Sequence, residues 1–148
     1  MAEKFQKIIA QLPYSEPFLF VDQLLELNDE GCRGRFTFKK DLDFYRGHFK
    51  DYPITPGVIL TECCAQIGLA CFGTYLIGEI EKDTQVVMTS SEMEFNLPVY
   101  PGQTVEVEAQ KVYYRFNKLK CKVRMYNEKG ELICKGVLAG MLKGDKDG

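Results

Sequence analysis

The sequence predicts an α+β fold in which a curved antiparallel β-sheet wraps around one long central α-helix. The stretch from Val58 to Ile80 is apolar on nearly every side, so as a helix it must be covered all round. From Thr84 onward, β-branched and aromatic residues alternate with polar ones, which is typical of strands that bury one face. A sheet that curls around the helix satisfies both patterns.

The residues before the long helix predict one short helix and two strands. Apolar residues have helical spacing within residues 3–10, and two prolines then break the pattern. Segments 18–27 and 32–39 have strand character and flank a turn-prone cluster at 28–31. These two strands begin the sheet.

The connection at 41–57 is unusually rich in aromatic residues for a solvent-exposed loop. Four of them need somewhere to pack, so we expect the loop to fold against the core: Phe44, Tyr45, Phe49 and Tyr52. Thr55 and Pro56 are suited to the N-cap and the first turn of the helix that follows. The apolar run then continues to about Ile80.

The second half of the chain predicts a four-stranded antiparallel meander. Pro-, Gly- and Asn-containing turns separate strands expected at 85–95, 103–115, 118–127 and 131–142. The polar tail, 143–148, is expected to be frayed. A sheet of so few strands cannot cover the helix on all sides, so we expect a second subunit to cover the rest.

The bulk composition describes one ordinary domain, residues 1–148. Apolar residues make up 45% and charged residues 27% of the chain, a balance that favours a folded globular protein over disorder. The formal net charge is −2, so the chain as a whole has no attraction for phosphate backbones, and we expect no nucleic-acid partner.

The cysteines and the N-terminus predict a cytoplasmic protein. The six cysteines form no CxxC pair, and we expect reduced, buried thiols with no metal site. The N-terminus lacks the continuous apolar core of a signal peptide. Polar residues, Glu62 among them, interrupt the long apolar stretch, so we expect it to be buried in protein with no membrane insertion.

His48 is the only histidine of the chain and lies between Gly47 and Phe49, shortly before the long helix. A neutral imidazole at such a position is a competent general base near pH 7. The alternative is a histidine that only makes hydrogen bonds between the loop and the core.

Glu62 lies among apolar residues in the second turn of the predicted helix, too far along it to cap the helix end. A carboxyl group in apolar surroundings is paired, faces a polar cavity, or stays protonated with a raised pKa. Buried carboxylic acids are proton donors in enzymes, so Glu62 and His48 outline an acid and base pair. The alternative places Glu62 on a solvent-facing stripe.

Gly57 and Val58 follow Pro56 at the predicted helix start. Their N–H groups lack partners within the helix and lie at the positive end of its dipole, where they can polarise a carbonyl oxygen. By itself, Pro-Gly before a helix is common and has low specificity.

Three segments together resemble the 3-hydroxyacyl-[acyl-carrier-protein] dehydratases: LPYSEPFLFVD, FYRGHFKDYPITPGVILTECCAQ and FNLPVYPGQTVEVEAQ. The resemblance runs from about Leu12 to Leu142. It implies the hot-dog fold, a homodimer as the minimal active unit that often forms a trimer of dimers, and no metal or organic cofactor. The partner it implies is acyl carrier protein loaded with a 3-hydroxyacyl chain.

The resemblance also implies residue roles. His48 removes the proton from C2, and Glu62 of the other subunit helps the C3 hydroxyl to leave as water. The Gly57 N–H, with Val58 beside it, binds the thioester carbonyl, and Gln66 is a further expected substrate-binding residue. Two alternatives stay open: a hot-dog acyl thioesterase, and a non-catalytic acyl-binding subunit.

The chain departs from the usual family pattern in three places. Family members often read LPHRYPF where this chain reads LPYSEPF, with Tyr14, Ser15 and Glu16 in place of a basic pair. They often read HFPG where this chain reads HFKD at 48–51, and a usually basic stretch reads EFNL at 94–97. Four cationic residues remain near the expected substrate entrance and could face an acidic carrier protein: Arg33, Lys39, Arg46 and Lys50. None of these departures changes His48 or Glu62.

Overall fold

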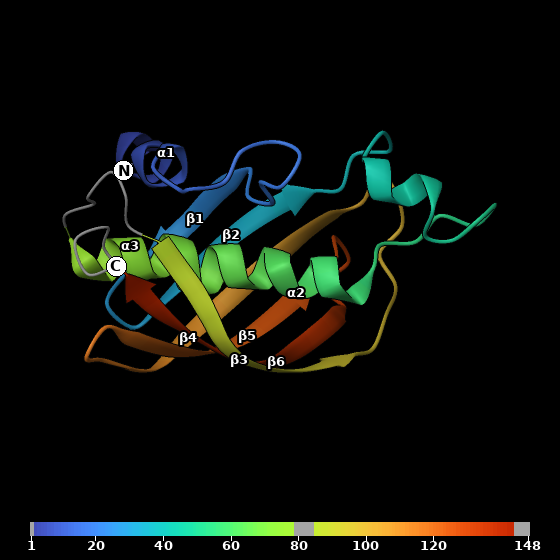
Figure 1. Ribbon diagram of the computed structural model, residues 1–148. Coiled ribbons are helices and arrows are strands. Elements are labelled where there is room, and N and C mark those ends of the chain that lie inside the picture. The colour runs from blue at the N-terminus through green and yellow to red at the C-terminus, as the bar shows by residue number, and fades with distance from the viewer. Residues whose placement is uncertain (1, 79–84, 144–148) are drawn as a thin grey trace.

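The computed structural model describes residues 2–78 and 85–143, and it shows one sheet curved around one long helix (Figure 1). The helix is continuous from Gly57 to Ile77 and comprises α2 (Gly57–Ala65), a π-helical turn η2 (Gln66–Cys71) and α3 (Phe72–Ile77). The helix ends at Ile77, earlier than the expected end near Ile80, because Gly78 with φ 85° forms its C-cap. The expected fraying of the tail beyond 143 lies outside the described residues. The predicted curved sheet around one long helix is confirmed.

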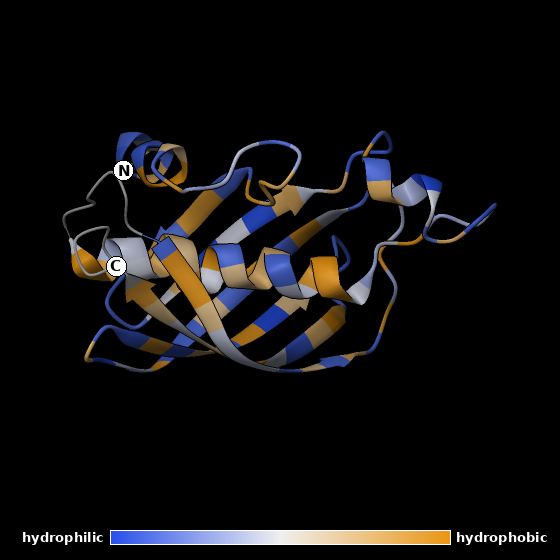
Figure 2. Ribbon diagram, in the orientation of Figure 1, coloured by the Kyte–Doolittle hydropathy of each residue, from blue (hydrophilic) through white to orange (hydrophobic). Residues whose placement is uncertain are grey.

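The sheet has six antiparallel strands in the order β1-β2-β4-β5-β6-β3. The predicted four-stranded meander is correct for β4, β5 and β6 and wrong for β3, which pairs with β6 because the connection to β4 crosses over, so that β4 pairs with β2 instead. Their bounds are Gln23–Leu27 (β1), Gly31–Thr37 (β2), Gln85–Phe95 (β3), Thr104–Arg115 (β4), Lys118–Tyr126 (β5) and Leu132–Lys143 (β6). Figure 2 shows hydrophobic and hydrophilic bands alternating along these strands, as expected when one face packs on the helix. A short helix, α1 (Ala2–Ala10), lies beside β1.

The helix is the centre of the core, and it lies very close to the sheet. Although it is long and apolar enough to span a membrane, 72% of its most apolar window is buried within the protein. A Cβ at Gly68 would lie 3.1 Å from Val123 Cγ1 and 3.2 Å from Ala109 Cβ, so a side chain there would require these neighbours to shift. The long apolar stretch is therefore a core helix, as predicted.

Buried thiols support the π-helical turn. The Cys32 thiol on β2 donates to the Ile67 carbonyl at 3.5 Å, and the Cys121 thiol on β5 donates to the Gly68 carbonyl at 3.4 Å. Because a π-helical turn disturbs the regular i→i−4 ladder, its carbonyls need other partners. All six cysteines are buried and free, as the sequence predicted.

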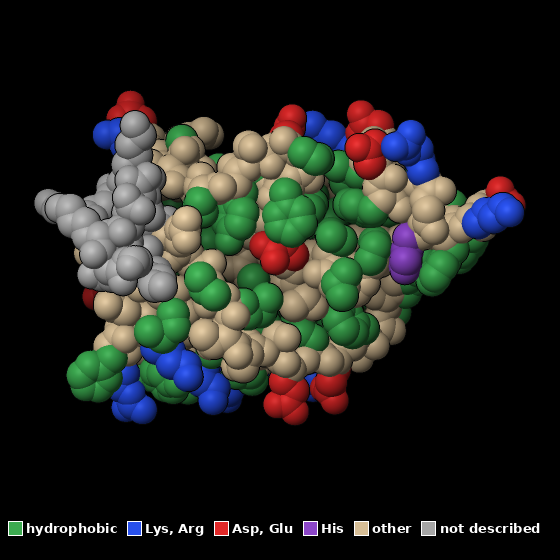
Figure 3. Space-filling view, in the orientation of Figure 1, with side chains coloured by type: hydrophobic (Ala, Val, Ile, Leu, Met, Phe, Trp, Pro, Cys, Tyr) green, Lys and Arg blue, Asp and Glu red, His purple; other side chains and the backbone are tan. Residues whose placement is uncertain are grey.

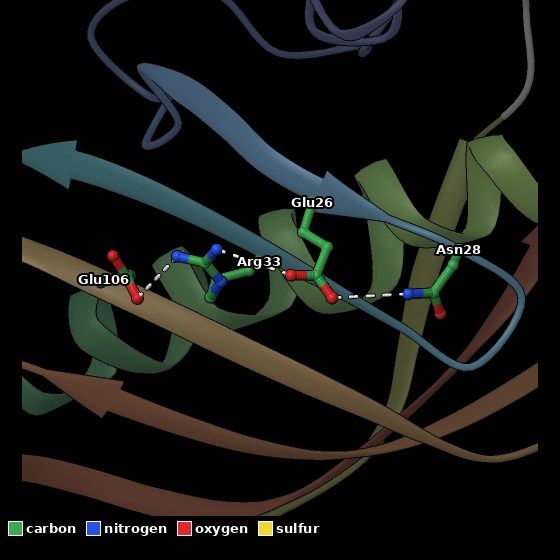
Figure 4. A network of polar contacts seen from close by, with 4 residues as sticks. All are labelled: Glu26, Asn28, Arg33 and Glu106. Carbon is green, nitrogen blue, oxygen red and sulfur yellow. Dashed lines mark hydrogen bonds and ion pairs between the residues drawn. The ribbon is translucent and has the colours of Figure 1, made fainter. Parts of the chain in front are cut away.

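An ion-pair network crosses the face of the sheet opposite the helix (Figure 4). Arg33 on β2 contacts Glu26 on β1 at 3.5 Å and Glu106 on β4 at 3.1 Å, and Asn28 donates to Glu26 at 3.4 Å. These side chains are partly exposed, so each pair contributes no more than about 1 kcal/mol. Arg33 is thus occupied within the sheet and is a poor candidate for contacting a carrier.

Three further details, at the start of the sheet and of the helix, differ from the sequence expectations. The first strand begins at Gln23 rather than at residue 18, because the Phe20 N–H donates to the Gln66 side chain instead of to a strand. The helix begins at Gly57 with Pro56 as N-cap. Thr55 does not cap it, because its hydroxyl bonds the Tyr45 hydroxyl and its N–H donates to Val99.

The aromatic loop is only partly folded against the core. Tyr45, in the 3₁₀ helix η1 (Asp43–Arg46), is buried, and Phe44 packs beside it. Phe49 and Tyr52, however, are more than half exposed on the single chain, contrary to expectation. Exposed aromatic side chains beside the start of the central helix identify a surface suited to a partner.

Candidate active site

His48 is held in one orientation by its own loop. Its Nδ1 lies 2.9 Å from the Ile54 carbonyl, its ring stacks on Phe49, and the Ile54 N–H returns a hydrogen bond to the His48 carbonyl. A carbonyl oxygen can only accept, so a neutral imidazole must carry its hydrogen on Nδ1. Nε2 is then left with a free lone pair, which is what a general base requires.

The helix start lies in the same surface hollow as His48. The hollow is lined by residues of the His48 loop, of the first helical turn and of the segment after β3: His48, Phe49, Ile54, Thr55, Gly57, Leu60, Phe95, Asn96, Leu97 and Pro98. A Cβ at Gly57 would lie 3.3 Å from the Phe95 ring, so the absence of a side chain keeps this approach open. Within the described chain, the N–H groups of Gly57 and Val58 donate no hydrogen bond.

Glu62 is half-buried on the second turn of the helix. Burial raises the pKa of its carboxyl group, and a hydrogen bond from Gln66 partly offsets this. Figure 3 shows acidic side chains surrounded by hydrophobic ones in the middle of the face that carries the central helix, with the histidine at the margin of the same face. A raised pKa keeps Glu62 available as a proton donor nearer to neutral pH.

Tyr14 is a neighbour of Glu62 that the sequence did not single out for a role. Burial, followed by the charge of Glu62, raises the pKa of Tyr14 to about 12. The phenol therefore stays protonated beside the carboxyl group. In the sequence, Tyr14 stands out only as a departure from the family pattern. Nothing in the spacing places residue 14 beside residue 62.

Gln66 is placed differently from its expected substrate-binding role. It is fully buried, its Oε1 accepts from the Phe20 N–H at 2.7 Å, and its Nε2 donates to the Phe18 carbonyl and to Glu62 Oε2, each at 3.0 Å. No amide hydrogen is left for a substrate. The expected contact of Gln66 with substrate therefore stays a prediction, and its amide hydrogens are both used within the chain.

The predicted site residues form two groups on one chain. His48 and Gly57 share the hollow, whereas Glu62 and Gln66 are joined elsewhere on the helix. No hydrogen bond or ion pair joins His48 to Glu62 across residues 2–78 and 85–143. In the same ranges, no three His, Cys, Asp or Glu side chains gather into a group able to hold a metal ion.

A family model for the FabA-like domain matches residues 12–138, most of the chain. The chain belongs to the FabA-like family. Among FabA-like relatives, a 3-hydroxyacyl-[acyl-carrier-protein] dehydratase FabZ from Ehrlichia canis is 30% identical and covers 97% of each chain. The enzyme of the same name from Sinorhizobium fredii is 32% identical over 96% of this chain and 91% of its own. The predicted family and dehydratase activity are confirmed.

Solved structures confirm the hot-dog fold of this FabA-like chain. The dehydratase heterocomplex ApeI:P from Xenorhabdus doucetiae has a TM-score of 0.79 at 12% identity, covering 94% of this chain and 92% of that one. A thioesterase from Haemophilus influenzae has a TM-score of 0.60 at 14% identity, covering 82% and 78%. At such identities the likeness shows the fold alone.

Proposed function

We propose that this protein removes water from 3-hydroxyacyl chains on acyl carrier protein to give trans-2-enoyl chains. His48 Nε2 takes the C2 proton, the C3–OH bond breaks as Glu62 gives its proton to the leaving hydroxyl, and the C2=C3 double bond forms. The Gly57 N–H, with Val58 beside it, holds the thioester oxygen and so makes the C2 proton more acidic. The observation that carries this proposal is the His48 ring with Nε2 free beside an open helix start.

The active unit in this proposal is a homodimer, because the two halves of the site lie apart on one chain. Strand β3 is eleven residues long and, within the described residues, pairs with β6 alone. A long free strand edge is a template for pairing with a second copy. Val58, 76% exposed beside the aromatic loop, is a hydrophobic residue that such a copy would cover.

A pair of copies related by a two-fold axis can bring Glu62 of one copy to His48 of the other. A trimer of dimers is a larger assembly of the same unit. The proposed location is the cytoplasm, where six free thiols remain reduced.

The β4–β5 hairpin is the proposed docking surface for the acidic carrier. Residues 109–127 contain no acidic residue and six cations: Lys111, Arg115, Lys118, Lys120, Lys122 and Arg124. Within the described chain none of the six forms an ion pair, whereas Arg33 and Arg46 each do. Phe116, 92% exposed, lies at the hairpin turn. A basic surface of this kind complements an acidic partner and speeds its association.

Reversing the charge of the hairpin should weaken the use of carrier-bound substrate. In a Lys118→Glu, Lys120→Glu double variant we expect the KM for an enoyl-carrier substrate to rise about tenfold or more at low salt, because rim charges act chiefly on association. Turnover of a small enoyl thioester without the carrier should stay unchanged. The docking surface would be refuted if the double variant lost activity equally on both substrates, or if it lost activity on neither substrate.

The reaction itself is tested with the reverse hydration of a crotonyl thioester. We expect purified protein to remove the conjugated enoyl absorbance without releasing free thiol. Thiol release without hydration would identify a thioesterase instead. Binding of the thioester with neither reaction would identify a non-catalytic acyl-binding subunit.

A further inference from the structure

The buried Gln66 amide lies between the proposed acid and the backbone of the segment before β1. Its Oε1 lies 2.7 Å from the Phe20 N, and its Nε2 lies 3.0 Å from both the Phe18 carbonyl oxygen and Glu62 Oε2. The side chain is 0% exposed, so water cannot substitute for any of these partners. One amide therefore connects a helix residue to a segment more than forty residues away.

The backbone determines which way round this amide lies. A peptide N–H can only donate, so the atom of Gln66 that faces Phe20 must be its oxygen. A peptide carbonyl can only accept, so the atom that faces Phe18 must be its nitrogen. The amide cannot flip without breaking both hydrogen bonds, and a buried unsatisfied donor or acceptor is costly. Glu62 is therefore always presented with an N–H donor.

We propose that Gln66 is a positioning residue for the dehydration: it keeps Glu62 Oε2 as a hydrogen-bond acceptor, so that the transferable proton resides on Oε1. This inference rests on the proposed role of Glu62 as the acid. An oxygen that accepts the Gln66 hydrogen at 3.0 Å cannot direct its own hydrogen at the same amide. The proton is left on the other oxygen, which makes no hydrogen bond within the described chain and is free to meet the substrate hydroxyl.

The same hydrogen bond assists the transfer. Once Oε1 has given up its proton, the carboxylate is left in a half-buried site, where charge is unfavourable. The Gln66 N–H stabilises that charge, because hydrogen bonds to ionised groups are stronger than those to neutral ones. The sign agrees with the structure, where the Gln66 contact lowers the Glu62 pKa against the larger effect of burial.

Two substitutions at Gln66 test the inference in the full-length protein. Gln66→Met removes the donor to Glu62, and both backbone partners lose their bonds with it. Gln66→Glu, kept protonated by burial, can still accept from Phe20 and donate to Phe18, but it has no second hydrogen for Glu62. This second variant keeps the test valid if Gln66→Met does not fold. Gln6→Glu, at an exposed position of α1 outside the site and the docking hairpin, is the matched control.

The first readout is the titration of the Glu62 carboxyl carbon by NMR in glutamate-labelled protein, assigned by its loss in Glu62→Gln. We expect the Glu62 midpoint to rise in each folded Gln66 variant and to stay unchanged in Gln6→Glu. The second readout is kinetic. We expect kcat to fall about ten- to a hundredfold with KM little changed, the size expected for a lost hydrogen bond to a charged group.

An unchanged Glu62 titration in a folded Gln66 variant would overturn the inference, and so would a raised KM with normal kcat, which would make Gln66 a substrate-binding residue. The titration does not depend on turnover. If the wild-type protein has no dehydratase activity, the proposed function is overturned. A shifted Glu62 midpoint in the Gln66 variants would still support the hydrogen bond by which Gln66 positions Glu62.

Discussion

Replacing either member of the acid and base pair should lower the rate of dehydration by about 10²- to 10⁴-fold, the usual contribution of a general acid or base. His48→Ala removes the only imidazole of the chain. Glu62→Gln keeps the shape of the side chain and removes its transferable proton. Because the C2 proton and the C3 hydroxyl must leave the same substrate, neither residue can replace the other.

The measurement is kcat and kcat/KM for both variants on one 3-hydroxyacyl thioester, beside Glu108→Gln as control. Glu108 is an exposed glutamate on β4, so its loss should leave turnover unchanged. Circular dichroism and melting temperature should show intact folding in all three. Near-normal turnover of both site variants would rule out this pair as the chemical groups.

The raised pKa of Glu62 can be tested in the pH dependence of kcat. A carboxyl group gives up its proton as pH rises through its pKa, so proton donation by Glu62 should decline with rising pH. Burial moves that decline to higher pH than for an exposed glutamate. In Glu62→Gln, the decline of kcat with rising pH should therefore be absent and not merely moved to another pH.

The architecture was largely predictable because apolar residues follow a single spacing pattern within each helix or strand. The long, mostly apolar run after Pro56, interrupted by polar residues such as Glu62, favoured a buried helix, and the alternation after Thr84 favoured half-buried strands. Errors occurred where a tertiary contact replaced a local one. Thr55 has the chemistry of an N-cap, but the Tyr45 hydroxyl binds its side chain. Segment 18–22 has strand composition, but its backbone bonds Gln66.

The site was predictable in its residue types and unpredictable in its arrangement. A lone histidine, a carboxyl group among apolar residues and a Pro-Gly helix start can be recognised from spacing alone. The structure adds that the Gln66 amide bonds Glu62 and the Phe18 carbonyl, and that the charge of Glu62 raises the pKa of Tyr14. The sequence analysis did not single out the basic hairpin, although its nineteen residues contain no acidic one, and only the fold shows that its cations form no ion pair within the described residues.

The central claim is that two copies of the chain together build each reactive site, and mixing two inactive variants tests it most directly. His48→Ala and Glu62→Gln proteins, each inactive alone, are unfolded together, refolded at equal amounts and assayed. Half of the dimers should be mixed, and one of the two sites in each mixed dimer should carry both groups. Activity should thus return to about a quarter of the wild-type value.

The same variants refolded separately and combined just before the assay provide the control, and they should show no recovery beyond slow subunit exchange. Recovery to about a quarter after joint refolding would support sites that are shared between subunits. If the jointly refolded mixture stays as inactive as its components although mixed dimers have formed, His48 and Glu62 must act within one chain, and the shared-site account is wrong.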